Sequence, residues 1–121
     1  MLIGDEYLLA SLKLRNQRAL YSRLACHVSL SPWTPSQCAQ YLGAGLSAVG
    51  LSASALEPAA AELLSSASAG LPRGLCLLAR AAWIAAATQK AQKITPAHVQ
   101  AAFQQVPCVP GLLTPAVEVE P

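Results

Sequence analysis

Two arginines are the side chains in this sequence best placed to act on an anion. Arg73 follows Gly70-Leu71-Pro72, and the proline predicts a helix that begins at Pro72 and carries Arg73 in its first turn. A cation at that position opposes the helix dipole and is slightly unfavourable unless an anion lies nearby. This conflict between residue type and position favours a functional role for Arg73, the alternative being a surface side chain without one.

Arg23 is the second candidate. Arg15 and Arg18 are three residues apart and share one face of an expected helix, whereas Arg23 lies roughly 140° from that face at ~100° per residue. A guanidinium group is a planar fork of donors that suits phosphate oxygens. The position of Arg23 thus sets it apart from the other two arginines, the alternative being an ordinary surface residue of an amphipathic helix.

The cysteines and histidines do not predict a metal or nucleophilic site. Four cysteines occur at wide intervals without a C-x-x-C pair: Cys26, Cys38, Cys76 and Cys108. This spacing argues against a zinc site and against a disulfide scaffold. His27 and His98 lack a second ligand at metal spacing, so we expect solvated or helix-terminal histidines. Cys26 and His27 are adjacent and point in opposite directions on an extended chain, which excludes a thiol–imidazole dyad.

The composition predicts a mainly α protein. Of the 121 residues, 54% are apolar, 12% are charged and 5% are aromatic, with Ala and Leu dominating, a mixture that favours packed helices. The net charge of +2 is too small to indicate a nucleic-acid binder by itself. Lys13 and three arginines nevertheless make the first quarter of the chain basic, so DNA remains a candidate partner. The longest apolar stretch, residues 74–88, contains Arg80 and is shorter than a membrane span needs. We expect a soluble, cytoplasmic chain without a membrane span.

The first thirty residues are predicted to differ from the rest of the chain, because they include the end of a strand as well as helices. Met1-Leu2-Ile3 before Gly4 predicts the end of a buried strand, and we expect further chain before it. Apolar spacing predicts helices over residues 5–15 and 17–25, and residues 26–30 alternate weakly enough to allow another strand. Residues 31–33 predict a turn.

Four helices should follow. Thr34-Pro35 with Gln37 predicts a capping box at the start of a helix over residues 34–49, and Gly50 predicts its left-handed end. A second helix over residues 58–69 should end at Gly70. The third begins at Pro72 and, being apolar nearly all round, should be the central one. The fourth begins at Thr95-Pro96. The residues expected to face inward are Cys38, Tyr41, Leu42, Leu46, Val49, Leu63, Leu64, Ala67, Leu75, Leu78, Ala79, Ala82, Trp83, Ala86, Val99, Ala102, Phe103 and Val106.

The order of these pieces, over about residues 2–106, resembles the C-terminal part of AAA+ ATPases of the secretion-pathway A and transposition-helper type. Four short patterns carry the resemblance in the family's order. They are Leu2-Ile3-Gly4-Asp5-Glu6-Tyr7-Leu8, Leu20-Tyr21-Ser22-Arg23-Leu24, Gly70-Leu71-Pro72-Arg73 and Ile94-Thr95-Pro96-Ala97-His98-Val99. The resemblance implies a remnant of the nucleotide-binding domain over residues 1–31, a four-helix lid over 32–106 and a disordered Pro-rich tail over 107–121.

What the family does with these residues is implied by the resemblance alone. Arg73 corresponds to the sensor 2 arginine and Arg23 to the arginine finger, and Gly70 and Pro72 accompany Arg73 at the nucleotide. Such arginines stabilise the charge that develops on the phosphoryl oxygens during hydrolysis. The sequence lacks G-x-x-x-x-G-K-[ST] and the strand with paired acids, so ATP and Mg²⁺ would bind only if a partner supplies the P-loop half. We therefore expect no ATPase activity from the chain alone.

This chain also departs from the family. Asp5-Glu6 places two acids at the sensor 1 turn, and Cys76 stands where an asparagine would make a local hydrogen bond. The chain is either a truncated copy or one half of a split ATPase, with a role in DNA transposition or secretion. The expected partners are a second copy or an ATPase half, and DNA, a transposase or a secretion component. The alternative is a non-catalytic helical module that binds a protein or DNA.

Overall fold

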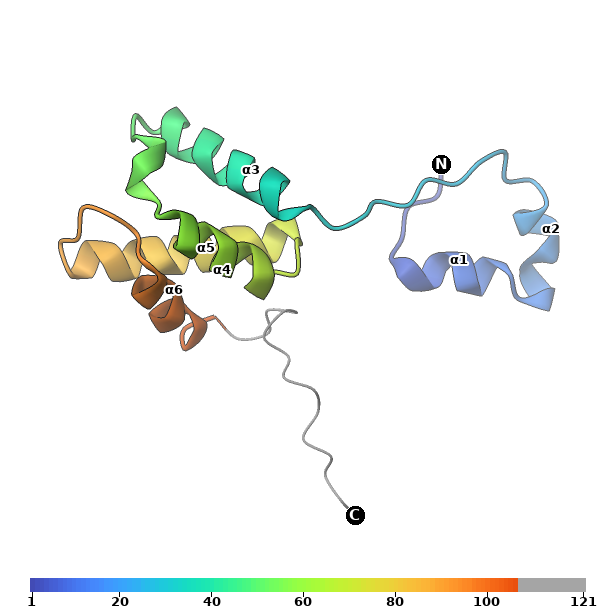
Figure 1. The fold of residues 1–121 in the computed structure, drawn as a ribbon. Helices are drawn as coiled ribbons and strands as arrows, with labels where there is room; N and C mark the ends of the chain where they lie inside the picture. The colour runs from blue at the N-terminus through green and yellow to red at the C-terminus, as the bar shows by residue number, and fades with distance from the viewer. Residues whose placement is uncertain (107–121) are drawn as a thin grey trace, which may run out of the picture. The chain divides into compact units, whose positions relative to one another are not determined.

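The computed structural model describes residues 1–106, which form two units. The first unit is Met1–Leu30, and the second begins at Ser31. The regular structure of the described residues consists of six α-helices and two short 3-10 turns, so the chain is mainly α, as predicted (Figure 1). The tail predicted over residues 107–121 lies outside the described residues.

The first unit contains two short helices. Helix α1 (Glu6–Leu12) begins after Asp5, whose carboxylate accepts a hydrogen bond from the Tyr7 N–H at 3.0 Å. The 3-10 turn η1 (Arg15–Gln17) leads directly into helix α2 (Arg18–Tyr21). Among the residues of this unit whose burial is described, only Leu12 is buried. The hydrophobic effect therefore contributes little to the stability of the first unit by itself.

The strand predicted at Leu2-Ile3 is not formed. Residues 1–5 carry no regular structure, and Leu2 and Ile3 expose 52% and 82% of their surface. Residues 26–30, which also allowed a strand, have no regular structure either. A strand requires a neighbour that pairs its backbone N–H and C=O groups, and the described part of the first unit offers none.

Helix α3 (Pro35–Ala48) begins and ends as predicted. The Gln37 N–H donates to Thr34 Oγ1 at 3.3 Å, and the Thr34 N–H donates to Gln37 Oε1 at 2.9 Å, which closes the capping box. Pro35 occupies the first helical position, where its missing N–H is not needed. Gly50 follows the helix with φ +79°, in the left-handed region expected of a C-terminal glycine.

Helix α4 (Pro58–Ala67) follows the 3-10 turn η2 (Ala53–Ala55) and is two residues shorter than predicted. Ala69 already adopts a left-handed conformation with φ +51°, and Gly70 follows it with φ +71°. Gly70, which was predicted to end the helix, is thus the second of two residues in the left-handed conformation. The helix ends early because the chain must turn twice before it enters the next helix.

Helix α5 (Pro72–Thr88) is the longest of the described helices and contributes most to the core, as expected for a central helix. Helix α6 (Pro96–Phe103) is the element that packs most extensively against it, and α4 contacts α3, α5 and α6 (Figure 1). A short parallel bridge joins the loops before α4 and α6. The Glu57 N–H donates to Ile94 O at 3.1 Å.

The core of the second unit consists of small and aliphatic side chains. Its largest fully buried apolar residues are Cys38, Leu64, Leu75, Leu78 and Val99. Three residues predicted to face inward are instead exposed: Tyr41 at 46%, Val49 at 69% and Trp83 at 39%. From residue 81 onward, the buried residues of α5 are all alanines, so the small side chains of this helix face the core and the indole of Trp83 lies on the other side.

Candidate functional site

Arg73 is the second residue of α5, and its side chain is exposed. The predicted position in the first turn of a helix is therefore confirmed. The first turn of α5 contains no acidic residue that would balance the cation against the helix dipole. The guanidinium group is available to an anion approaching the surface of the second unit.

The turn before Arg73 is fixed by contact with the chain that enters α3. The Gly70 carbonyl accepts a hydrogen bond from the Trp33 N–H at 2.8 Å. A Cβ atom at position 70 would collide with the Trp33 backbone, and φ +71° is itself a conformation that favours glycine. Gly70 and Pro72 thus shape the turn from which Arg73 projects; their place between two helices was predicted, whereas the contact with Trp33 was not.

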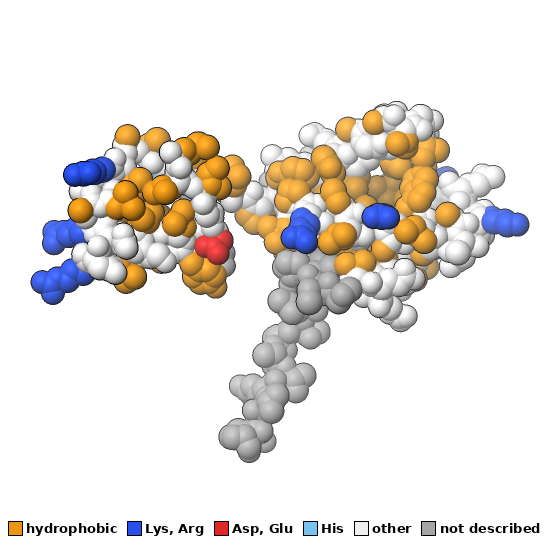
Figure 2. Space-filling view, turned by 180° about the vertical axis from the view of Figure 1, so that it is seen from behind, with side chains coloured by type: hydrophobic (Ala, Val, Ile, Leu, Met, Phe, Trp, Pro, Cys, Tyr) orange, Lys and Arg blue, Asp and Glu red, His pale blue; other side chains and the backbone are white. Residues whose placement is uncertain are grey.

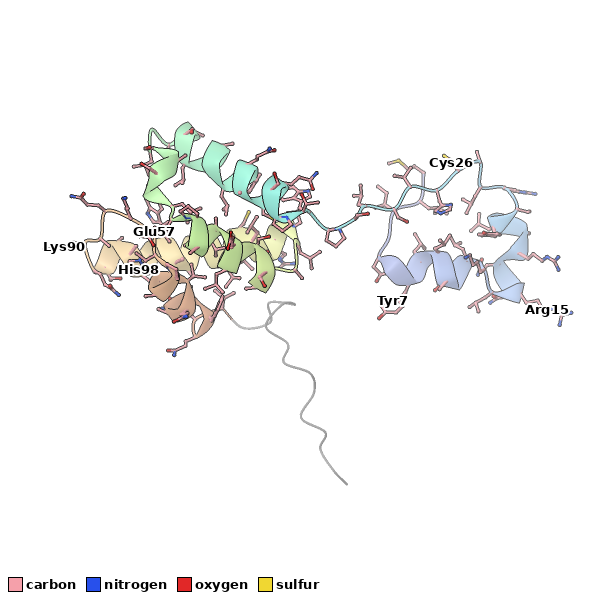
Figure 3. The ribbon with its side chains drawn as sticks, in the orientation of Figure 1. Tyr7, Arg15, Cys26, Glu57, Lys90 and His98 are labelled. Carbon is pink, nitrogen blue, oxygen red and sulfur yellow. The ribbon has the colours of Figure 1, made fainter. Side chains whose placement is uncertain are left out.

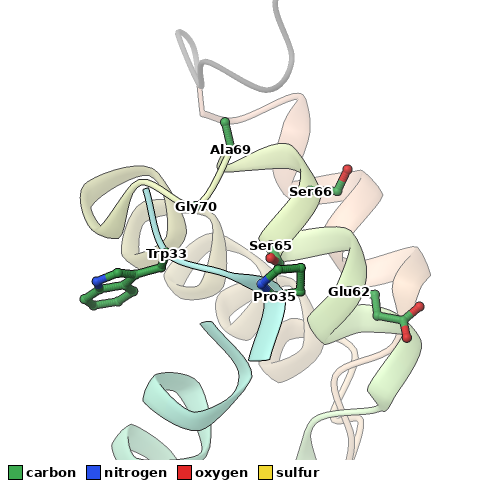
Figure 4. Close-up of a pocket in the computed structure, with 7 residues that line it drawn as sticks. All are labelled: Trp33, Pro35, Glu62, Ser65, Ser66, Ala69 and Gly70. Carbon is green, nitrogen blue, oxygen red and sulfur yellow. The ribbon is translucent and has the colours of Figure 1, made fainter. Parts of the chain in front are cut away.

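A hollow of about 530 Å³ lies beside this turn. It is lined by Trp33, Pro35, Glu62, Ser65, Ser66, Ala69 and Gly70 (Figure 4). The indole of Trp33 and the side chain of Glu62 lie at opposite edges of the close-up (Figure 4). Arg73 does not line the hollow, and Glu62 is its only charged lining residue. Because that charge is negative, the hollow does not favour a phosphate group.

Cys76, which stands where the family resemblance would place an asparagine, contacts helix α3. Its Sγ lies 3.5 Å from Tyr41 Oη, and either group can donate. The hydrogen bond with Cys76, the charge of its thiolate and desolvation together raise the pKa of Tyr41 above its ordinary value of 10.0. The Tyr41 and Trp33 rings lie 5.0 Å apart at 51°, so two aromatic residues of the α3 side flank the start of α5.

Arg23 belongs to the first unit. It is exposed and follows the end of α2, where its N–H donates to Leu20 O at 3.1 Å. Arg15 lies in η1 and Arg18 begins α2, so no single helix carries all three arginines. Arg23 is therefore not placed on a separate face of one helix, contrary to the prediction, because the three arginines do not share a continuous helix.

The two histidines differ in environment. His27 is exposed, whereas His98 is buried in the first turn of α6 (Figure 3). His98 Nδ1 accepts a hydrogen bond from the Thr95 N–H at 3.1 Å, and Nε2 lies 3.1 Å from Gln89 Oε1. With Nδ1 as acceptor, Nε2 carries the proton and donates to Gln89. His98 therefore ties the α5–α6 loop to α6, which fits the predicted helix-terminal position but not solvation.

No metal centre is assembled within residues 1–106, since no three His, Cys, Asp or Glu side chains there come together as a group. In the same part of the chain, no helix is both long and apolar enough to cross a membrane. The fold and site thus define a mainly α chain whose four-helix second unit presents an exposed arginine at a helix start. No protein-family model, curated protein or solved structure matches this sequence or fold.

Proposed function

We propose that this chain is the sensor and helical-lid end of an AAA+ ATPase of the transposition-helper or secretion-pathway A type. In this proposal Arg73 is the sensor 2 arginine, Arg23 is the arginine finger, and the protein acts in the cytoplasm. The observation that carries the proposal is the placement of Arg73. It is an exposed cation in the first turn of the third helix of a four-helix unit, held by the Gly70 turn.

The arrangement of the second unit supports the proposal through the order of its parts. Helix α3 starts at a Thr-Pro cap, the Gly70 turn leads into Pro72 at the start of α5, and Ile94-Thr95 precedes α6. The last two are lid patterns of the family resemblance, and all three parts lie at the start of a helix. A guanidinium group at such a turn can neutralise phosphoryl charge in a way that lysine, a point charge, cannot match.

The described residues do not by themselves fit ATP and Mg²⁺. The hollow beside Arg73 carries a negative lining charge, and residues 1–106 contain no cluster of metal ligands. Nucleotide and metal would have to be held by a P-loop half on another chain. The contribution proposed for this chain is limited to its arginines and to the lid that positions them.

The test is hydrolysis by a reconstituted protein, with the P-loop half supplied in trans or by fusion. Purified alone, the chain should show no turnover above background. With the P-loop half, Arg73→Gln should lower turnover by about 10³-fold, the scale of arginines that act on the phosphoryl transition state. Two exposed arginines serve as matched controls. Arg80→Gln, on the same helix, is the control for Arg73→Gln, and Arg18→Gln, in the first unit, is the control for Arg23→Gln.

A thermal melt of the same variants separates function from folding. Arg73→Gln should leave the fold unharmed or slightly more stable, because it removes a cation opposed to the helix dipole. Leu75→Ala should cost roughly 2 to 5 kcal/mol, since Leu75 is fully buried. Unfolding by Arg73→Gln with unchanged turnover per folded molecule would contradict the assignment, as would magnesium-dependent turnover by the chain alone.

A non-catalytic helical module that binds a protein or DNA is the second candidate. The observation that favours it is the exposure of apolar residues of α5, such as Leu77 and Ile84, beside the exposed Arg80. An open reading frame upstream that encodes a P-loop half would favour the ATPase proposal over this one.

A further inference from the structure

Helix α5 has a second apolar face that points away from the core. Leu77, Trp83 and Ile84 expose 44%, 39% and 50% of their surface, and Arg80 between them is exposed as well. Leu77, Arg80 and Ile84 fall within roughly 60° of one another around the helix at ~100° per residue. We call these four residues the outer α5 face. Trp83 lies roughly 100° from Ile84 around the helix, at the edge of this face where a hollow adjoins it, so exposed apolar side chains extend over a wide part of the α5 surface.

A hollow of about 300 Å³ adjoins the outer α5 face at Trp83. Its walls are mostly apolar and include Leu51, Ala55 and Ala91, with Lys93 among the few polar lining residues. Figure 2 shows hydrophobic side chains around a hollow on this face of the second unit. The volume exceeds the ~150 Å³ that accommodates a benzene ring, so one large apolar side chain can enter.

Charge within the second unit is segregated. All four basic residues of the range 31–106 lie on α5 or on the loop that follows it: Arg73, Arg80, Lys90 and Lys93. The two acidic residues of that range lie elsewhere, Glu57 before α4 and Glu62 in the wall of the other hollow. In Figure 2, this face of the second unit shows basic side chains among hydrophobic ones and no acidic side chain. A ligand of this face should be negatively charged and partly apolar.

We propose that the outer α5 face and its adjoining hollow bind an acidic amphipathic helix of a partner protein. One large apolar side chain of that helix enters the hollow, and its carboxylates face Arg80 and Lys93. A nucleic-acid backbone is less suited, because it gains nothing from the aliphatic side chains on both sides of Arg80. The interaction does not depend on nucleotide binding, and it holds whether or not the chain serves an ATPase.

The test uses the full chain and a fluorescein-labelled peptide of about 18 residues, or five helical turns. The peptide carries leucines at i, i+3, i+4 and i+7 and glutamates on the flanks, and its counterpart has lysine at every glutamate. Fluorescence anisotropy should show binding of the acidic peptide and at least about tenfold weaker binding of the lysine peptide. Arg80→Glu and Ile84→Ser should each weaken binding by about tenfold. The peptide should gain helical circular dichroism when it binds.

Arg18→Glu is the matched control, because it makes the same change in net charge in the first unit. It should alter the Kd by less than about twofold. Equal weakening by Arg18→Glu and Arg80→Glu, or no weakening by Ile84→Ser, would overturn the proposal. Leu77→Ser replaces Ile84→Ser if a melt shows that the latter unfolds.

Two further outcomes would assign the face to a different occupant and so also overturn the proposal. Binding of a DNA duplex that Arg80→Glu abolishes and Ile84→Ser leaves intact would indicate a nucleic-acid surface. Dimerisation that Ile84→Ser abolishes, in a protein that does not bind the acidic peptide, would indicate a second copy of this chain. Failure of the hydrolysis experiment above would leave the peptide result unaffected.

Discussion

Gly50 and Gly70 have the same left-handed backbone but different surroundings. Their φ angles are +79° and +71°, yet a Cβ atom at Gly50 would meet open space, whereas one at Gly70 would collide with the Trp33 backbone. We expect Gly50→Ala to cost ~1–2 kcal/mol from the backbone conformation alone. Gly70→Ala should cost ~1 kcal/mol or more beyond that, because backbone atoms cannot yield as a side chain can.

Chemical denaturation of the two variants measures this difference in the free energy of unfolding. Equal losses for Gly50→Ala and Gly70→Ala would mean that the Trp33 contact does not constrain the turn. This outcome would also weaken the argument that the turn before Arg73 is rigid. Both glycines were predictable as helix terminators, but the contact with Trp33 was not, since it joins segments far apart in the sequence.

The Cys76 and Tyr41 pair should appear in an alkaline titration. Cys76 raises the pKa of Tyr41 above 10.0, through the hydrogen bond first and the thiolate charge second. Cys76→Ala should therefore lower the midpoint of phenolate formation towards the ordinary value. Cys76→Ser, which keeps a hydrogen bond and removes the charge, should fall between the two proteins.

The measurement requires that Tyr41 be the only tyrosine, because the chain has three. Tyr7→Phe with Tyr21→Phe provides that background, and both residues lie in the first unit. An unchanged midpoint in Cys76→Ala would show that the sulfur and the phenol do not interact in solution. The pair was not predictable, since residues 35 apart meet only when α3 and α5 pack together.

At the scale of the element, α5 ends with a residue poorly suited to its backbone. Lys90 follows the helix with φ +53°, a left-handed conformation that disfavours residues with a Cβ atom. Lys90→Gly should therefore stabilise the protein by ~0.5–1 kcal/mol. At ~4–8 °C per kcal/mol for a domain of this size, a thermal melt resolves the change.

Gln89→Gly is the control for this prediction. Gln89 has φ −87°, so glycine brings no conformational relief there, and it also removes the hydrogen bond to buried His98. Gln89→Gly should therefore destabilise the protein by ~1 kcal/mol or more. If both glycine variants lower the melting temperature, the left-handed conformation at position 90 does not persist in solution.

Helix starts were more predictable than helix ends or faces. Thr34-Pro35, Pro58, Pro72 and Thr95-Pro96 mark starts because proline and cap residues act through their own backbone. The early end of α4 at Ala67 depends on the turn that reaches Trp33, which no local pattern encodes. Trp83 was assigned to the core because α5 is apolar nearly all round, and only the packing of alanines decides which side is buried.

At the scale of the molecule, the two units differ in how much core each contains. The core cluster of the second unit draws on α3, α4, α5 and α6 and includes no residue before Trp33. Arg73, the hollow beside the Gly70 turn and the Cys76–Tyr41 pair also lie within that unit. The fold class was predictable because alanine and leucine spacing suffices for helices. The strand at Leu2-Ile3 was not correctly predicted, because a strand depends on partners outside its own sequence.

The exposed apolar N-terminus leads to a prediction about self-association. Met1 and Ile3 expose most of their surface, and Leu2 exposes about half. Among the residues of the first unit whose burial is described, only Leu12 is buried. Apolar surface left in water favours association. We therefore expect concentration-dependent self-association, or a partner that covers these residues, and improved monodispersity after deletion of residues 1–3.

Sedimentation velocity over a range of concentrations measures the effect, and the double substitution Leu2→Ser with Ile3→Ser tests it at constant chain length. Neither change should alter the thermal melt of the second unit, since its core includes none of these residues. A monodisperse monomer with Met1–Ile3 intact would contradict the prediction. Association that survives the double substitution but is lost in Ile84→Ser would place the contact on the outer α5 face, where Ile84 exposes 50% of its surface.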